Sequence, residues 1–133
     1  MDNKLEYIPG DLVMVKSSAL QFAKDKIFKV ISSLSGGFLK VVMLNDSSTT
    51  YSISNNAIRP IPLTTEILEK NGWREEKGDY INDNYHIKLC EKIDGYSAYK
   101  VVNDTIVWLR DVKSVSNLQH LLFGLGLNSE MEV

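Results

Sequence analysis

The side chains in this sequence that are best suited to nucleophilic catalysis are Cys90, His86 and His120. A catalytic thiol needs a base within hydrogen-bonding distance to remove its proton. His86 and Cys90 lie four residues apart in a predicted strand, which separates them by roughly 13 Å at about 3.3 Å per residue. This separation is too large for a thiolate–imidazole pair, and His120 falls in a predicted helix. The sequence therefore predicts no catalytic residues and a protein that is not an enzyme.

Metal and phosphate sites are not predicted either. Two histidines and one cysteine without close spacing fall short of the ligand sets that zinc prefers. Asn82-Asp83-Asn84 is typical of a turn. Gly36-Gly37 lacks the following lysine of a phosphate-binding loop, and Gly124-Leu125-Gly126 follows a predicted helix instead of opening one. We therefore expect no metal and no cofactor.

The composition is that of an ordinary soluble globular chain. Its 133 residues are 44% hydrophobic and 24% charged, with a formal net charge of -2. This balance gives no overall attraction to nucleic acid or to anionic lipid. The single cysteine excludes an intrachain disulfide. No apolar run approaches the roughly 20 residues of a membrane helix, and the N-terminus lacks a signal-peptide pattern, so we expect a cytoplasmic protein without a membrane partner.

The sequence pattern of residues 1–62 predicts short strands separated by turn residues. The expected strands cover residues 11–16, 27–31, 38–44, 49–53 and 57–62. Five short strands at this spacing favour a closed sheet, because closure removes exposed strand edges. This half has seven basic and five acidic residues. We predict an SH3-like small β-barrel over residues 1–62, ending at Pro60-Ile61-Pro62.

The C-terminal residues 63–133 favour an α+β unit with eight basic and twelve acidic residues. Thr64 is suited to cap a helix over residues 64–71, and Ser114 to cap one over 115–124. Between them the apolar pattern has a period of two, with Asp94-Gly95 as a strong hairpin signal. We predict an antiparallel meander of three or four strands flanked by two short helices. The acidic residues 128–133 are expected to form a partly frayed tail. The alternative is one continuous, curved sheet without a domain boundary.

Two segments together resemble a known group of proteins. The first spans Ala57–Trp73 and contains the pattern PIPLT-x-E-x-L, and the second spans Val115–Gly126 and contains LQ-x-L-x-F-x-L. This pair resembles small uncharacterised bacterial proteins that are often encoded in prophages and other integrated mobile elements. Members usually begin the last helix with His-Gln, where this chain has Ser116-Asn117. The resemblance implies a genomic context and a fold, and it brings no activity, cofactor or catalytic residue.

Aromatic side chains crowd into the C-terminal half and favour a protein-interaction surface. Aromatic residues are enriched at the energetic centres of protein interfaces. In the strand over residues 96–102, Tyr99 and Val101 alternate with Tyr96 and Ala98, so at least one large aromatic side chain faces outward. The candidate interface residues are Trp73, Tyr96, Tyr99 and Trp108. We expect a non-catalytic adaptor or structural protein that binds a protein partner or a second copy of itself.

Nucleic-acid binding by the N-terminal barrel is the alternative. Small barrels often bind nucleic acid through a groove rimmed by loops. The candidate contacts are Lys24, Lys26, Lys29 and Lys40, with Phe22, Phe28 and Phe38 as stacking partners. The structural explanation of the same residues is that the phenylalanines fill the barrel and the lysines protect its edges.

Overall fold

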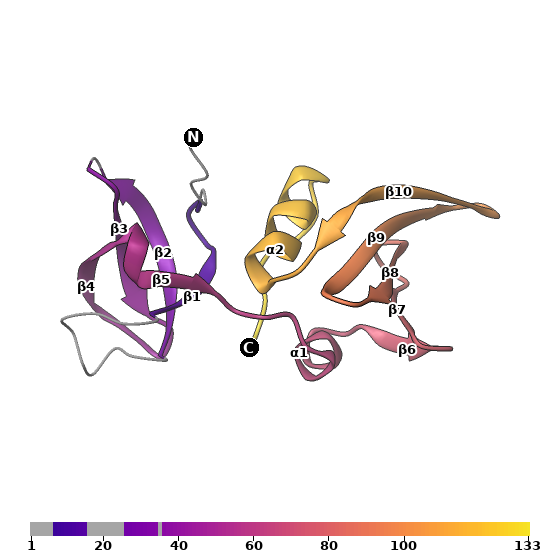
Figure 1. The fold of residues 1–133 in the computed structure, drawn as a ribbon, viewed down its shortest axis with the longest axis horizontal. Helices are drawn as coiled ribbons and strands as arrows, with labels where there is room; N and C mark the ends of the chain where they lie inside the picture. Colours follow the sequence, from indigo (N-terminus) through magenta and orange to yellow (C-terminus); the bar gives the residue numbers. More distant parts are fainter. Residues whose placement is uncertain (1–6, 16–25, 35) are drawn as a thin grey trace. The chain divides into compact units, whose positions relative to one another are not determined.

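The computed structural model describes residues 7–15, 26–34 and 36–133. The chain divides into two compact units, Met1–Ile61 and Pro62–Val133. Within the described residues, each unit holds one antiparallel five-stranded sheet, and the C-terminal unit also holds two α-helices (Figure 1). The predicted α+β class is therefore confirmed. No helix in this part of the chain is long and apolar enough to cross a membrane.

The N-terminal sheet has the strand order β4-β3-β2-β1-β5, so that β1 pairs with both β2 and β5. Its strands are β1 (Leu12–Val15), β2 (Ile27–Leu34), β3 (Phe38–Met43), β4 (Asp46–Ser54) and β5 (Ile58–Pro60). A short 3₁₀ helix, Asn55–Ala57, connects β4 to β5. The strand pairing among the described residues leaves β4 and β5 as edges and does not close the sheet.

The core of the N-terminal unit comes from alternate residues of all five strands. Phe28 is fully buried, and its ring meets that of Tyr51 edge-to-face with centroids 6.0 Å apart. Phe38, by contrast, is 43% exposed, and Phe22 lies outside the described residues. The buried cluster consists of Tyr7, Val13, Val15, Phe28, Val30, Leu39, Val41, Ile53 and Ile58. Of the three predicted stacking partners, Phe28 is thus a core residue.

The C-terminal sheet is a meander in which each strand pairs with the next along the chain. Its strands are β6 (Arg74–Glu76), β7 (Asp79–Asn82), β8 (Ile87–Lys92), β9 (Gly95–Val102) and β10 (Thr105–Val112). The meander has five strands, where the sequence predicted three or four. The first hairpin of the meander pairs Arg74–Glu76 with Asp79–Ile81 across the Lys77-Gly78 turn. Both residues of that turn have positive φ angles, as tight hairpin turns require.

Two helices flank the meander in sequence, α1 (Thr65–Lys70) and α2 (Val115–Gly124). The Thr64 hydroxyl accepts a hydrogen bond from the Ile67 amide at 3.2 Å, and the Ser114 hydroxyl accepts one from the Asn117 amide at 3.1 Å. These bonds satisfy amides that have no partner within the first helical turn. Both predicted helices and both predicted caps are confirmed.

The C-terminal segment returns to the end of α1. The Asn71 side chain donates to the Glu132 carbonyl oxygen at 2.7 Å and accepts from the Glu132 amide at 2.8 Å. The Gln119 side chain also donates to the Ser129 carbonyl oxygen at 3.1 Å. The sequence predicted a partly frayed tail, and in the structure these side-chain amides form hydrogen bonds with its backbone.

A β-bulge interrupts the pairing of β9 with β10. Trp108 pairs with Tyr99 and Arg110 pairs with Ala98, which leaves Leu109 as an extra residue. Side chains four residues apart in a regular strand point to the same side. Here Val112 is fully buried while Trp108 is 57% exposed. The bulge therefore shifts the alternation of side chains along β10, so that the side chains of Trp108 and Val112 lie on opposite faces of the sheet.

We expect Gly95→Ala to destabilise the protein by about 2 to 4 kcal/mol. Gly95 has a φ angle of +141°, and a Cβ atom there would lie 2.6 Å from the Val112 carbonyl oxygen, which belongs to the backbone. Gly78 also has a positive φ angle but no atom within 4 Å of the added Cβ, so Gly78→Ala should cost only about 1 to 2 kcal/mol. Gly124→Ala, in α2 without either constraint, should stabilise by a few tenths of a kcal/mol. Urea unfolding of the three variants measures this order, and equal losses for Gly95 and Gly78 would contradict it.

Candidate functional site

A row of side chains crosses one face of the C-terminal sheet from edge to edge. The cross-strand partners follow one another as Arg74, Ile81, Lys88, Tyr99 and Trp108, one residue from each strand. We call these five residues the outer row. The neighbouring row on the opposite face includes Tyr80, Leu89 and Ala98, which are 6%, 0% and 0% exposed. The sheet thus has one buried face and one face that carries the outer row.

Aromatic and aliphatic side chains gather at the β9–β10 end of that face. Trp108 pairs with Tyr99, and Ile106 pairs with Val101 in the next register position on the same face. Trp108 is 57% exposed and Ile106 is 51% exposed, while Tyr99 and Val101 are half-buried. We call these four residues the outer patch. An aromatic pair beside an aliphatic pair is the type of surface that buries well against another protein.

A hollow of about 270 Å³ lies beside the outer patch. Its lining residues are Arg74, Glu76, Ile81, Asp83, His86, Lys88, Val101 and Ile106. The hollow combines aliphatic side chains with charged ones of both signs. Its volume lies slightly below the range of about 300 to 1,000 Å³ that is usual for small-molecule sites.

The charged groups of the hollow are paired within the sheet. The Arg74 guanidinium donates to both Asp83 carboxylate oxygens, at 2.8 and 3.1 Å, and to Glu76 at 3.2 Å. These hydrogen bonds lower the pKa of Asp83 and raise the pKa of Arg74. The Lys88 ammonium lies 3.4 Å from Asp79. Because these charges already have partners, the hollow is poorly suited to bind an ion. Its charged side chains form a polar rim beside the outer patch.

Cys90 and His86 do not come together in the hollow. His86 lies in the turn before β8 with a φ angle of +56°, so it is not the strand residue that the sequence predicted. Its side chain lines the hollow, whereas Cys90 is not among the lining residues. Burial raises the pKa of the Cys90 thiol, and the nearby Asp79 carboxylate raises it further. Among the described residues, no group of three or more His, Cys, Asp or Glu side chains is arranged to hold a metal ion.

The four aromatic residues proposed as an interface separate into two pairs. Trp73 and Tyr96 are 4% and 5% exposed, so both belong to the interior and are unavailable as a surface. Tyr99 and Trp108 meet as cross-strand partners on the outer face. Ile106 and Val101 also belong to this exposed surface, although the sequence did not predict them as interface residues. The alternation of β9 places Val101 beside Tyr99, and the register of β10 brings Ile106 opposite Val101.

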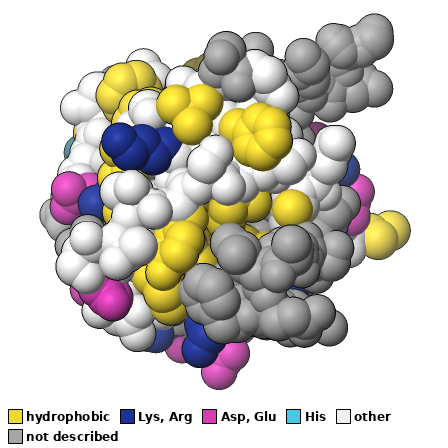
Figure 2. All heavy atoms as spheres, turned by 90° about the vertical axis from the view of Figure 1, so that its left-hand side faces the viewer, with side chains coloured by type: hydrophobic (Ala, Val, Ile, Leu, Met, Phe, Trp, Pro, Cys, Tyr) yellow, Lys and Arg dark blue, Asp and Glu magenta, His cyan; other side chains and the backbone are white. Residues whose placement is uncertain are grey.

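The four candidate lysines lie in the N-terminal half, and Lys24 is outside the described residues. Lys29 and Lys40 are exposed on the face of the sheet opposite the core cluster. On the side seen in Figure 2, Lys and Arg side chains form separate spots, while hydrophobic side chains gather across the middle. The described basic residues therefore do not form a continuous strip on this side.

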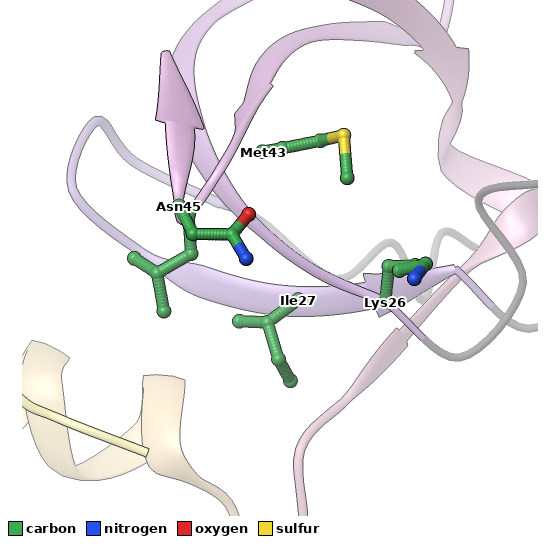
Figure 3. Close-up of a pocket in the computed structure, with 5 residues that line it drawn as sticks. Lys26, Ile27, Met43 and Asn45 are labelled. Atoms are coloured by element: carbon green, nitrogen blue, oxygen red, sulfur yellow. The ribbon is translucent and has the colours of Figure 1, made fainter.

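Lys26 lines a separate hollow of about 280 Å³ in the N-terminal unit, at the start of β2 and the end of β3 (Figure 3). The other lining residues are Ile27, Met43, Leu44 and Asn45. This hollow offers one ammonium group, one amide and three apolar side chains. Such a set lacks the several converging donors that would fix a phosphate group.

Comparison with known protein families finds no match for this chain, and comparison with curated protein sequences finds none either.

We expect the Cys90 thiol to react with iodoacetamide at pH 8 more slowly than a free cysteine. A raised pKa leaves less thiolate at a given pH, and the thiolate is the reactive form. Asp79→Asn removes a carboxylate that raises the pKa, so it should speed the reaction, whereas Asp83→Asn should not. The rate is measured by mass spectrometry, with the urea-unfolded chain as the control for an unperturbed thiol. A folded chain that reacts faster than the unfolded one would indicate an activated nucleophile and contradict this expectation.

Proposed function

We propose that the protein acts through protein–protein contacts, as a non-catalytic adaptor or structural protein. The observation that carries this proposal is the exposed Tyr99–Trp108 pair on the outer face of the C-terminal sheet, next to Val101 and Ile106. Tryptophan and tyrosine bury large areas with little loss of side-chain freedom, and they are enriched among residues that dominate binding energy. An outward-facing tryptophan has no folding role comparable to that of the buried Trp73.

The surroundings of the outer patch support the same function. Protein interfaces commonly have an apolar centre and a polar rim. The outer row passes from Trp108 and Tyr99 to Lys88 and Arg74, whose charges are held by Asp79 and Asp83. These paired groups need little rearrangement when a partner covers the patch, because their charges are already compensated.

The proposed setting is the cytoplasm of a bacterium that carries a prophage or another integrated mobile element. This part of the proposal rests on the resemblance of the Ala57–Trp73 and Val115–Gly126 segments to proteins of such elements.

We also propose that the N-terminal unit is an SH3-like small barrel. The strand order supports this, since β1 pairs with both β2 and β5 and the last strand thereby returns beside the first. The core cluster around Phe28 and the 3₁₀ helix before β5 are further support. A closed or nearly closed sheet would also explain how so few residues enclose the fully buried Phe28.

Nucleic-acid binding by the N-terminal unit is the second candidate function. The observation that favours it is that Lys29 and Lys40 share the face opposite the core, where their ammonium groups are free to meet a phosphate backbone. Lys26 is exposed at the start of β2. Binding of this kind would be independent of base sequence, since lysine contacts to phosphate do not read bases.

The interaction surface predicts that Tyr99→Ser abolishes the capture of a protein partner by this chain from a lysate of the source bacterium. The matched control is Tyr85→Ser, another half-buried tyrosine, whose hydroxyl donates to the Asn128 carbonyl oxygen and which is outside the outer row. A captured protein is then purified and its affinity for the three chains is measured by calorimetry. We expect a loss of about 2 kcal/mol or more for Tyr99→Ser and little change for Tyr85→Ser. Equal binding by all three chains would remove the outer patch as the contact surface.

The second candidate function predicts a gel shift of duplex DNA or RNA at low salt. Changing Lys24, Lys26, Lys29 and Lys40 to Glu should abolish the shift. The control chain carries the same change of net charge, with Lys70, Lys77, Lys92 and Lys113 of the C-terminal unit changed to Glu. For the unchanged chain, log affinity should fall with log salt by about 0.9 per phosphate contacted. If the unchanged chain gives no shift at low salt, or both variants lose it equally, this candidate is removed.

A further inference from the structure

The side chain of Asn71 ties the end of α1 to residues 128–133, which we call the strap. The Asn71 Nδ2 donates to the Ile67 carbonyl oxygen at 2.7 Å and to the Glu132 carbonyl oxygen at 2.7 Å. The Asn71 Oδ1 accepts from the Glu132 amide at 2.8 Å. This contact therefore needs a side chain that donates and accepts at the same time, as an amide does.

The strap also has other anchors in the C-terminal unit. Side chains that donate hydrogen bonds to its carbonyl oxygens, at 3.1 to 3.3 Å, are those of Tyr85, Gln119 and Lys70. Asn71 differs from these donors because it also accepts a hydrogen bond from the strap backbone. A change at Asn71 therefore alters one end of the strap and leaves its other anchors in place, so the effect can be followed locally.

Asn71 is followed by Gly72, and this is the only Asn-Gly pair in the sequence. An asparagine before a glycine is prone to spontaneous amide loss, because glycine has no side chain to keep its nitrogen from the preceding side chain. The Gly72 nitrogen gives up its proton to water or hydroxide and attacks Cγ of Asn71. The Cγ–Nδ2 bond then breaks, and Nδ2 takes up a proton and leaves as ammonia. Water opens the resulting cyclic imide at either carbonyl, which gives aspartate or isoaspartate.

The native hydrogen bonds oppose this reaction at both reacting groups. The attacking nitrogen is engaged, because the Gly72 amide donates to the Glu69 carbonyl oxygen at 3.2 Å. The leaving atom is engaged as well, since Nδ2 makes the hydrogen bonds to Ile67 and Glu132 and its departure breaks both. Ring closure needs the reacting atoms in contact and aligned. The strap therefore slows the loss of the amide that holds it.

We propose that Asn71 is a site of spontaneous amide loss whose rate the strap controls, and that this loss releases the strap from α1. The product carboxylate has no hydrogen to donate. The carbonyl oxygens of Ile67 and Glu132, each 2.7 Å from Nδ2, then face a negatively charged oxygen and repel it. Isoaspartate also lengthens the backbone between α1 and Gly72. Because the ammonia does not return, the change runs in one direction and its extent increases with the age of the chain.

The rate is tested by incubating the full chain at pH 8 and following the mass of the peptide that contains Asn71. We expect amide loss to be slower in the folded chain than in the urea-unfolded chain by about tenfold or more, because the reaction requires a local opening. Glu132→Pro removes the amide that donates to Asn71 Oδ1, so it should speed the loss in the folded chain by about threefold or more. The matched control is Glu132→Ala, which keeps both backbone groups and should leave the rate unchanged. Equal rates in the folded and unfolded chains, or no acceleration by Glu132→Pro, overturn the proposal.

The release is tested by hydrogen exchange of Asn71→Asp, which carries the side chain of one product. The Glu132 amide should exchange faster than in the unchanged chain by about tenfold or more, while the amides of β8 and β9 keep their protection. The matched control is Asn117→Asp. The Asn117 Oδ1 accepts from the Lys113 amide at 3.1 Å, a bond that a carboxylate can also accept, so the strap should be unaffected. An unchanged rate at Glu132, or an equal increase across β8 and β9, overturns the release.

This modification site is separate from the proposed partner surface, because Asn71 ends α1 whereas the outer patch lies on β9 and β10. Tyr99→Ser should therefore lose the captured partner and keep the rate of amide loss at Asn71. Glu132→Pro should change that rate while the outer patch keeps its residues, so the two proposals fail or stand independently.

Discussion

The placement of the surface residues depends on the register of the β9–β10 hairpin and on its single bulge. Trp108 and Val112 are four residues apart, yet one is exposed and the other is fully buried. A regular strand would point both side chains the same way, so burying Val112 would also bury Trp108. Leu109, inserted between the paired positions, resolves this conflict. The core and the outer patch can coexist on one strand only because the bulge separates them.

The tight turns of the meander preserve that register. A slip of one residue would exchange the two faces, bringing Tyr99 inward and Ala98 outward. Gly95 and the Asp94–Lys113 ion pair, 3.2 Å long, lie at the start of β9, where the backbone of Val112 is also close. Asp111 adds a second constraint on the outer face, accepting hydrogen bonds from Lys92 at 2.8 Å and from Ser97 at 2.9 Å. Polar contacts thus hold the register of the β9–β10 hairpin at one end, and the exposed apolar side chains lie toward its other end.

Much of the secondary structure could be predicted from the sequence, because local signals decide it. Thr64 and Ser114 cap the two helices, and the alternation of Tyr96 and Ala98 with Tyr99 and Val101 gives the faces of β9. The position of Trp73 could not be predicted, since an aromatic residue beside a turn suits the surface and the interior equally. The bulge at Leu109 has no sequence signal, because its cause is the simultaneous burial of Val112 and pairing of Trp108. The SH3-like closure and the roles of Tyr99, Trp108 and the lysines stay predictions.

The two edges of the C-terminal sheet differ in how their side chains meet solvent. At the β6 edge, Arg74 is held by Asp83 and Glu76, so its charges are compensated within the chain. At the β10 edge, the side chains of Ile106, Val107 and Trp108 remain in solvent. Leaving three such side chains exposed forgoes burial worth about 25 cal/mol for each Å² of apolar surface, and it also exposes the chain to aggregation. These exposed apolar side chains are the physical ground for proposing that the protein acts through protein contacts.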